Sequence, residues 1–188
     1  MSAMTWWDHE TESIWSQPWG RAIVGEQKGI ALFLLPSQIT SWANWRSQHP
    51  NTLVMTDDIA QMPNFRQKFD PDFVIGVILA DNAKAYRFEE VAERVVVNDT
   101  LGDVPILIWA SSDSFHTYIR DIGGQTLTFY ETDGNLLDHQ TNSTWSIVRG
   151  LAIEGDLQGQ VLQSLPSLTS FEDHWFDFYP NSILWKSE

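Results

Sequence analysis

Short apolar runs separated by Gly, Asn and Asp dominate the chain, and this pattern predicts strands rather than long helices. The run 73–80 is apolar and rich in β-formers, and we expect residues 83–88 to pair with it across a turn at Asp81-Asn82. Residues 95–110 predict two more strands around a turn at 98–103. We therefore expect a mainly β, α+β fold with a few short helices.

Turns and helices complete this prediction. Gly123-Gly124 and Asp133-Gly134 have the composition of tight hairpin turns. Three segments predict short helices, each expected to end before a polar or proline-containing stretch. They are Trp42–Gln48 with Thr40 or Ser41 as the cap, Phe88–Glu93, and Phe171–Phe178 with Thr169 or Ser170 as the cap.

The chain contains an internal repeat. Residues Asp8–Met55 align with Asp138–Trp185 at an offset of 130. Shared turn residues, glycines and large apolar residues at one fixed offset indicate a duplicated structural unit. The identical residues of the first segment include Asp8, His9, Thr11, Ser13, Trp15, Ser16, Gly20, Ala22, Ile23, Gly25, Gly29, Leu32, Leu35, Pro36, Ser37, Pro50 and Asn51.

The repeat divides the chain unequally. Residues 1–55 form a partial first copy, because nothing there corresponds to Phe73–Tyr130. Residues 56–72 are polar, carry two prolines and are interpreted as a linker. Residues 73–188 form a complete second copy, and we expect both copies to pack together as one globular domain.

Composition excludes several kinds of chemistry. The formal net charge of -14 repels nucleic-acid phosphates, so we expect no nucleic-acid partner. The chain has no cysteine, which excludes disulfides and thiolate chemistry. No apolar run approaches the roughly 20 residues needed to span a bilayer. No glycine pattern of a nucleotide site is present, and no cofactor is evident.

These patterns resemble a bacterial family, the domain of unknown function 3179. The resemblance rests on DHETESIWSQPWGRAIVG, FVIGV, AKAYRF, VVVNDTLGDVPILI and SFEDHWFDFYPNSILW. It implies an internal duplication whose first copy carries a Cys-Pro-Leu-Cys motif. By position that motif would fall on Ser111 and Ser114, as expected for a second copy. The resemblance therefore implies a fold and leaves the function open.

The repeated Asp-His pairs are the candidate catalytic or metal-binding residues. Asp8-His9 and Asp138-His139 occur once in each copy, and a His beside a carboxylate can transfer protons or bind a metal. His9 and His139 would be the metal ligands. The alternative is a turn in which Asp accepts backbone N–H groups while His packs on a Trp. His116, between Phe115 and Thr117, is expected to be a partly buried strand residue.

Ten tryptophans are the other unusual feature. Trp15 and Trp145 repeat between the copies and are expected to belong to the core. The others in the partial copy lack a complete unit to pack on, so we expect some of them at a ligand or protein interface, a sugar-binding platform being the alternative. These candidates are Trp6, Trp7, Trp19, Trp42 and Trp45.

The combined prediction is a β-rich binding or structural module rather than an enzyme. The alternatives are a metal-binding or hydrolytic protein built on the Asp-His pairs and a carbohydrate-binding module. Strands that lack partners favour a homodimer or docking to another chain through open edges. The start of the chain carries no signal peptide, which predicts a soluble cytoplasmic protein. Relatives are often exported, so an incomplete N-terminus would place it outside the cytoplasm.

Overall fold

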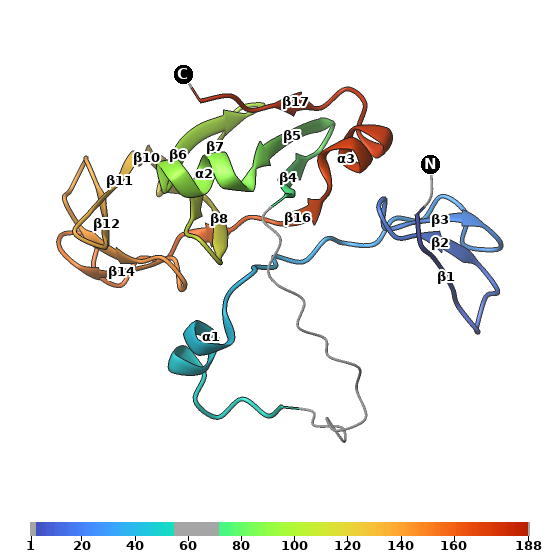
Figure 1. Ribbon diagram of the computed structural model, residues 1–188, viewed down its shortest axis with the longest axis horizontal. Coiled ribbons are helices and arrows are strands. Elements are labelled where there is room, and N and C mark those ends of the chain that lie inside the picture. Colours follow the sequence, from blue (N-terminus) through green and yellow to red (C-terminus); the bar gives the residue numbers. More distant parts are fainter. Residues whose placement is uncertain (1–2, 55–71, 188) are drawn as a thin grey trace.

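The computed structural model describes residues 3–54 and 72–187, and it is mainly β with three short helices in that part of the chain (Figure 1). The first copy forms a three-stranded antiparallel sheet of order β1-β2-β3, followed by an extended stretch and one helix. All but one residue of the predicted linker 56–72 lie outside the described residues. The first-copy elements are β1 (Thr5–Trp7), β2 (Ile14–Ser16), β3 (Arg21–Val24) and α1 (Trp42–Gln48).

Two four-stranded sheets form the centre of the second copy. One has the order β16-β4-β5-β17 and the other β15-β8-β7-β6. In each sheet, strands from the end of the chain add to the edges of hairpins formed earlier in the copy. The bounds are β4 (Val74–Leu79), β5 (Asn82–Arg87), α2 (Phe88–Arg94), β6 (Val96–Leu101), β7 (Val104–Ala110), β8 (Phe115–Ile119), β15 (Gln163–Ser164), β16 (Ser167–Ser170), α3 (Glu172–Phe178) and β17 (Ile183–Leu184).

A third sheet, of order β11-β12-β13-β14, lies at the end of the second copy opposite α3 (Figure 1). A small hairpin, β9-β10, leads into it. The strands are β9 (Asp121–Ile122), β10 (Gln125–Thr126), β11 (Phe129–Thr132), β12 (Asn135–Asp138), β13 (Thr144–Ser146) and β14 (Leu151–Glu154).

The two copies have the same local geometry. Trp6 pairs with Trp15 in the first copy as Leu136 pairs with Trp145 in the second. Both copies show a register irregularity at the equivalent position. It lies immediately before Trp15 in the pairing of β2 with β3, and immediately before Trp145 in the pairing of β13 with β14. A short bridge follows in each, Arg21 to Ala31 and Leu151 to Val161. The duplication predicted from sequence is therefore present in the backbone.

The core of the second copy joins its two halves. Leu162 lies with Leu107, Tyr118 and Phe129 in one cluster of buried side chains. Leu165 belongs to the cluster of β4, β5, α2, β6 and β7. On the other face of the first sheet, Trp175 of α3 is 1% exposed. The residues that cover these side chains come mostly from β4 to β11, so the second half of the unit depends on the first half for its core.

Tight contact explains why β4 carries a glycine in its middle. A Cβ atom on Gly76 would lie 2.0 Å from the ring of Trp175, so only glycine lets α3 approach the sheet this closely. The indole N–H of Trp175 donates to the Ser182 hydroxyl at 2.6 Å, which fixes the ring over the strand.

Most predicted elements are confirmed, with four corrections. Helix α1 has the predicted bounds and Ser41 as its cap, whereas α3 begins at Glu172 with Phe171 as a cap that makes no side-chain hydrogen bond. α2 extends one residue further, to Arg94. The turn of the first hairpin lies one residue earlier than predicted, because Leu79 pairs with Asn82, and the turn of the second is shorter than predicted, because Leu101 pairs with Val104.

The fourth correction concerns the segment after Gly123-Gly124. A hairpin turn at Gly123-Gly124 predicts one strand over residues 125–131, but the structure has two, β10 and β11, separated by Leu127 and Thr128. The guanidinium of Arg120 donates to the Leu127 carbonyl at 2.7 Å, and the Leu127 N–H donates to the Arg120 carbonyl at 2.8 Å. Leu127 is fully buried, so the chain bends at this point to place its side chain in the core.

We predict that W175A destabilises the protein far more than W45A, although the two residues occupy equivalent positions. Removing a fully buried indole costs about 3–5 kcal/mol. Trp45 is only half-buried and should cost about 1 kcal/mol or less. Urea unfolding followed by circular dichroism measures the loss in the free energy of unfolding for both variants. Equal losses would contradict the finding that α1 has no buried residue.

Candidate functional site

An aspartate organises the first turn of each copy. The Asp8 carboxylate accepts the backbone N–H of Thr11 at 2.6 Å and the indole N–H of Trp15 at 2.7 Å. Asp138 accepts the equivalent N–H group at 2.6 Å and that of Trp145 at 2.9 Å. The indole hydrogen bond is the main cause that lowers the pKa of Asp8 to about 2, with the Thr11 N–H next.

A serine and a glycine stabilise the next turn in both copies. Ser13 Oγ accepts the backbone N–H of Gln27, and Ser143 Oγ accepts that of Leu157, each at 3.0 Å. A Cβ on Gly25 would lie 2.6 Å from Ser13 Cα, and its φ of +97° also favours glycine. These contacts lie within one copy, so each three-stranded unit is held together by its own turn.

The histidines of the repeated pairs point away from these carboxylates. His9 packs edge-on against Trp7 with ring centroids 4.5 Å apart, and His139 stacks on Tyr130 at 4.3 Å. The two hairpins lie at opposite ends of the molecule (Figure 1). The structure therefore does not bring Asp8, His9, Asp138 and His139 together, and the residues it describes contain no group of three or more potential metal ligands. The aspartates serve the turns of their own copies.

His116 lies on β8 and lines a small cavity of about 450 Å³ between the two copies. It is almost completely buried, and burial lowers its pKa to about 4. Trp45 and Ser37 form part of the opposite wall. Sequence reasoning placed His116 on a strand but missed the cavity, because the other wall comes from a distant segment.

The extended stretch of the first copy continues across the second copy at this point. Ile39 forms an isolated antiparallel bridge with Phe115, whose N–H donates to the Ile39 carbonyl at 3.1 Å. The Ser37 hydroxyl donates to the Ser167 carbonyl at 3.1 Å. Since Ser37 and Ser167 are equivalent positions of the repeat, the two copies touch through matching segments.

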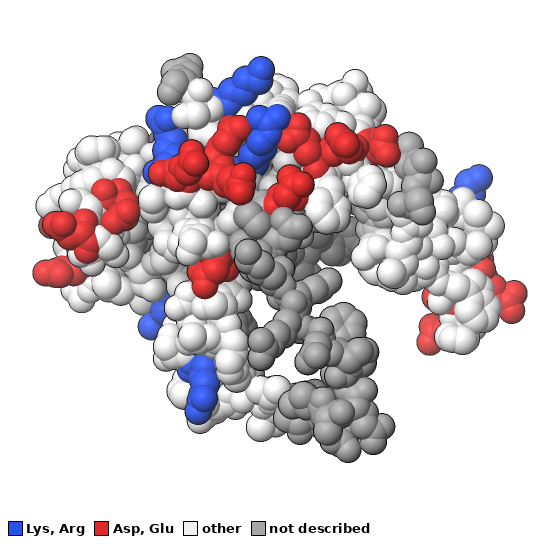
Figure 2. Space-filling model, viewed as in Figure 1, with Lys and Arg blue, Asp and Glu red and all other residues white. Residues whose placement is uncertain are grey.

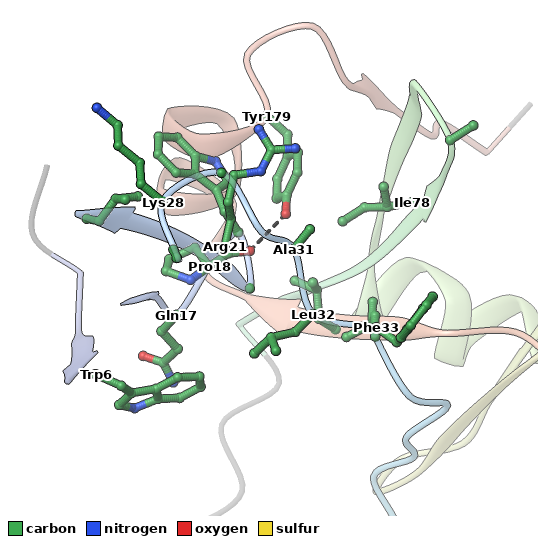
Figure 3. Close-up of a pocket in the computed structure, with 18 residues that line it drawn as sticks. Trp6, Gln17, Pro18, Arg21, Lys28, Ala31, Leu32, Phe33, Ile78 and Tyr179 are labelled. Carbon is green, nitrogen blue, oxygen red and sulfur yellow. Dashed lines mark hydrogen bonds between the residues drawn. The ribbon is translucent and has the colours of Figure 1, made fainter. Parts of the chain in front are cut away.

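A groove of about 990 Å³ runs along the first-copy sheet (Figure 3). One wall carries Leu32 and Phe33, and Trp6 closes one end. Ile78 and Tyr179 contribute from the second copy. Most of the side chains that line it are apolar, and none of its lining residues among those described is acidic, although the chain is strongly acidic.

The groove is open because first-copy core residues are uncovered. Leu32 is 53% exposed, whereas its equivalent Leu162 is 2% exposed. Leu35 is 74% exposed, whereas Leu165 is 1% exposed. These residues are identical in type and position, so their exposure reflects what lies over them and not their chemistry.

The predicted interface tryptophans divide into three kinds. Trp6, Trp7 and Trp42 are exposed. Trp19 packs edge-on against Phe178, and its indole N–H donates to the Phe178 carbonyl at 3.4 Å. The Tyr179 hydroxyl donates to the Pro18 carbonyl at 2.8 Å, which is the dashed contact in Figure 3. Trp19 therefore attaches the first-copy sheet to the end of α3.

Trp45 is the third kind. Its indole N–H donates to the Thr52 hydroxyl at 2.9 Å, as Trp175 donates to Ser182. Sequence reasoning missed that Trp45 and Trp175 are also an identical pair at the offset of 130, which is the signal that would have found it. Of the predicted core pair, Trp145 is buried, whereas Trp15 is only half-buried.

Acidic residues gather away from the groove, whereas the cationic residues Arg21 and Lys28 line it. Figure 2 shows Asp and Glu side chains around α2 and α3 and at the outer hairpins. Arg87 joins α2 to α3 through Glu90 at 2.8 Å and Glu172 at 2.6 Å. Between the central sheets, Asp99 accepts hydrogen bonds from Tyr86 and Lys84. Burial of Asp99 opposes its ionisation, but these two bonds prevail and lower its pKa.

These features define the chain as a β-rich, internally duplicated module. The model of one family matches it twice, over residues 1–71 and 60–187, as expected for a repeated unit. The chain belongs to this family, the proteins of unknown function DUF3179. No curated protein and no solved structure shows a significant match. None of the helices in the described part is long and apolar enough to cross a membrane.

We predict that the indole N–H signal of Trp15 titrates in the acid range with a midpoint of about 2. The folded-state pKa of Asp8 lies below its ordinary value of 3.8, so the hydrogen bond is complete above pH 4 and is lost as the pH falls through 2. Proton NMR of the indole resonance measures this midpoint. A midpoint near 3.8 would contradict the network, and D8N should remove the titration.

His116 predicts a second pH effect, of opposite chemical origin. Its neutral form is favoured in the folded protein, whereas the unfolded chain takes up a proton below pH 6.5. The free energy of unfolding should therefore fall by up to about 3 kcal/mol between pH 7 and 4 because of this residue. Urea unfolding of the natural chain and H116Q at both pH values tests it, since H116Q should lose that part of the decrease.

Proposed function

We propose that the chain is a protein-binding module whose first copy presents an open half-core to another polypeptide. The observation that carries this proposal is the exposure of Leu32 and Leu35 beside their buried equivalents Leu162 and Leu165. Burying two such side chains is worth about 1.5–3 kcal/mol each. An exposed apolar surface next to a groove is typical of an interface.

Further exposed apolar residues of the first copy support the same function. At four positions the first copy carries exposed apolar residues where the second copy carries polar or charged ones. Because these positions do not face the core in the second copy, their apolar character is not needed for the fold of the unit. They are Val24, Ile30, Phe33 and Leu34, against Glu154, Gln160, Gln163 and Ser164.

Open backbone positions favour a polypeptide over a small ligand. In the second copy, residues 163–164, 167–170 and 183–184 are strands added to β8, β4 and β5. Their first-copy equivalents are 33–34, 37–40 and 53–54, and within the described residues only Ile39 has a ladder partner among them. A partner strand could pair with such edges.

The position of Trp6 separates this proposal from the carbohydrate alternative. Trp6 takes the place of Leu136, a buried core residue of the second copy, and lines the groove. A core position filled by a large apolar side chain favours packing against protein side chains. A sugar-binding platform would instead require aromatic rings at positions that face solvent in both copies of the unit.

We predict that the purified chain self-associates at micromolar concentration when no partner fills the groove. Light scattering and sedimentation should show a mass above that of one chain. The double substitution L32D/L35D should shift the chain to the monomer, because charges at both positions oppose burial.

I153D provides the matched control. Ile153 is an exposed apolar residue at the position equivalent to Ile23, but it belongs to the complete copy. It should leave the association unchanged. A strictly monomeric natural chain, or equal effects of I153D and L32D/L35D, would contradict a binding role for the first-copy face.

A further inference from the structure

The second copy shows what covers the side chains that the first copy leaves open. Leu162 contacts the cluster that includes Leu107, Tyr118 and Phe129, and Leu165 lies in the cluster around Ile75. Trp175 lies against Gly76, between Val74 and Ala85. All these covering residues belong to 73–130, the half of the unit that has no counterpart in the first copy.

We propose that the occupant of the open face is a polypeptide segment that carries this first half, that is, the counterpart of residues 73–130. This inference rests on the proposed function and identifies the partner. It follows from the repeat itself: identical core residues at equivalent backbone positions require the same complementary surface.

Backbone register defines three of the contacts. Strand β16 pairs antiparallel with β4, from Ser167 opposite Val77 to Ser170 opposite Val74. Residues 37–40 would pair with the partner's β4 in the same way. Residues 53–54 would add to its β5 in parallel, as β17 does, and 33–34 would add to its β8, as β15 does.

Gly20 marks the place of a specific side chain. A Cβ on its equivalent, Gly150, would lie 2.7 Å from the ring of Tyr118, so the glycine makes room for that aromatic ring. At Gly20 only the Leu32 Cβ lies within 4 Å, at 3.9 Å. The Tyr118 hydroxyl donates to the Ile147 carbonyl. The partner's tyrosine would enter the space beside Gly20 and donate to the carbonyl of Gln17, the equivalent position.

Trp45 is positioned for the same partner. Its indole is held by Thr52 as that of Trp175 is held by Ser182, although α1 has no buried residue. A glycine in the partner's first strand, equivalent to Gly76, would let α1 approach as α3 does.

A second copy of this chain does not supply the half. Residues 73–137 are already covered by the second half of their own copy, with Ile75, Tyr86, Ile106 and Leu107 fully buried. Releasing them would expose the second-copy core. Self-association through the open face is therefore expected only when no half-unit occupies that face. The half-unit is the complementary partner.

The fit is tested by a chain in which a second copy of residues 73–137 is joined directly to Asp8 of 8–188. In the natural chain Leu137 precedes Asp138, the equivalent of Asp8, so the junction reproduces an existing peptide bond. Tethering supplies the half at high effective concentration. We expect amide exchange at 32–35 to slow by on the order of 100-fold or more, towards the rates at 162–165.

Two further readouts accompany this chain. W45A, nearly neutral in the natural chain, should lower the urea midpoint as much as W175A does. Self-association should disappear. The same chain with L32D/L35D is the control and should keep fast exchange at 32–35. An added half that stays protease-sensitive, with 32–35 exchanging as in the natural chain, would overturn the proposal.

Co-expression tests whether the half docks without a covalent link. A tagged 73–130 fragment should be retained by the full chain and not by its L32D/L35D variant. A protected tethered chain without retention of the fragment would support the half-unit as the occupant and exclude its docking as a free fragment. Association of the natural chain through Leu32 and Leu35, with no protection by the tethered half, would refute this partner alone. A natural chain that is monomeric and already protected at 32–35 would refute the binding function itself.

Discussion

Apolar contact between the two halves of the repeat unit is the interaction on which the rest of the structure depends. The second half contributes few strands of its own to the core, and its large side chains are buried only where β4 to β11 lie against them. In the second copy this contact is complete, and Leu162, Leu165 and Trp175 are hidden from water. In the first copy the same residues have no such cover. The open groove and the exposed leucines follow from this one difference.

The first-copy sheet nevertheless keeps the shape of its counterpart. Its Asp8 carboxylate, Ser13 hydroxyl and Gly25 backbone satisfy the turn from within the same segment, so the hairpin geometry does not require the missing cover. This local determination explains why the aspartates recur in both copies. It also explains why a shared Asp-His pair, which suggested acid-base or metal chemistry, leads to two separate turns. The carboxylate is used by the fold, and each histidine packs on an aromatic ring.

Polar contacts and a backbone bridge join the two copies. Ser37, Ile39, Trp19 and Tyr179 join them through a few hydrogen bonds and ring contacts. The groove lies beside these contacts and is bounded by both copies. An occupant of the first copy would therefore also touch Ile78 and Tyr179, which links binding to the complete unit.

The sequence by itself determined the duplication, most strand positions, helix α1 with its cap, and the two glycine turns, because hydrophobic period and turn chemistry are local properties. It also indicated that strands of the partial copy lack partners. Only the tertiary structure decided which large side chains are covered: Leu32 and Leu162 are the same residue in the same local setting, and burial depends on segments distant in the chain. The split of β10 from β11, the depth of His116 and the roles of Trp19 and Trp45 were likewise decided by long-range packing, which no local pattern encodes.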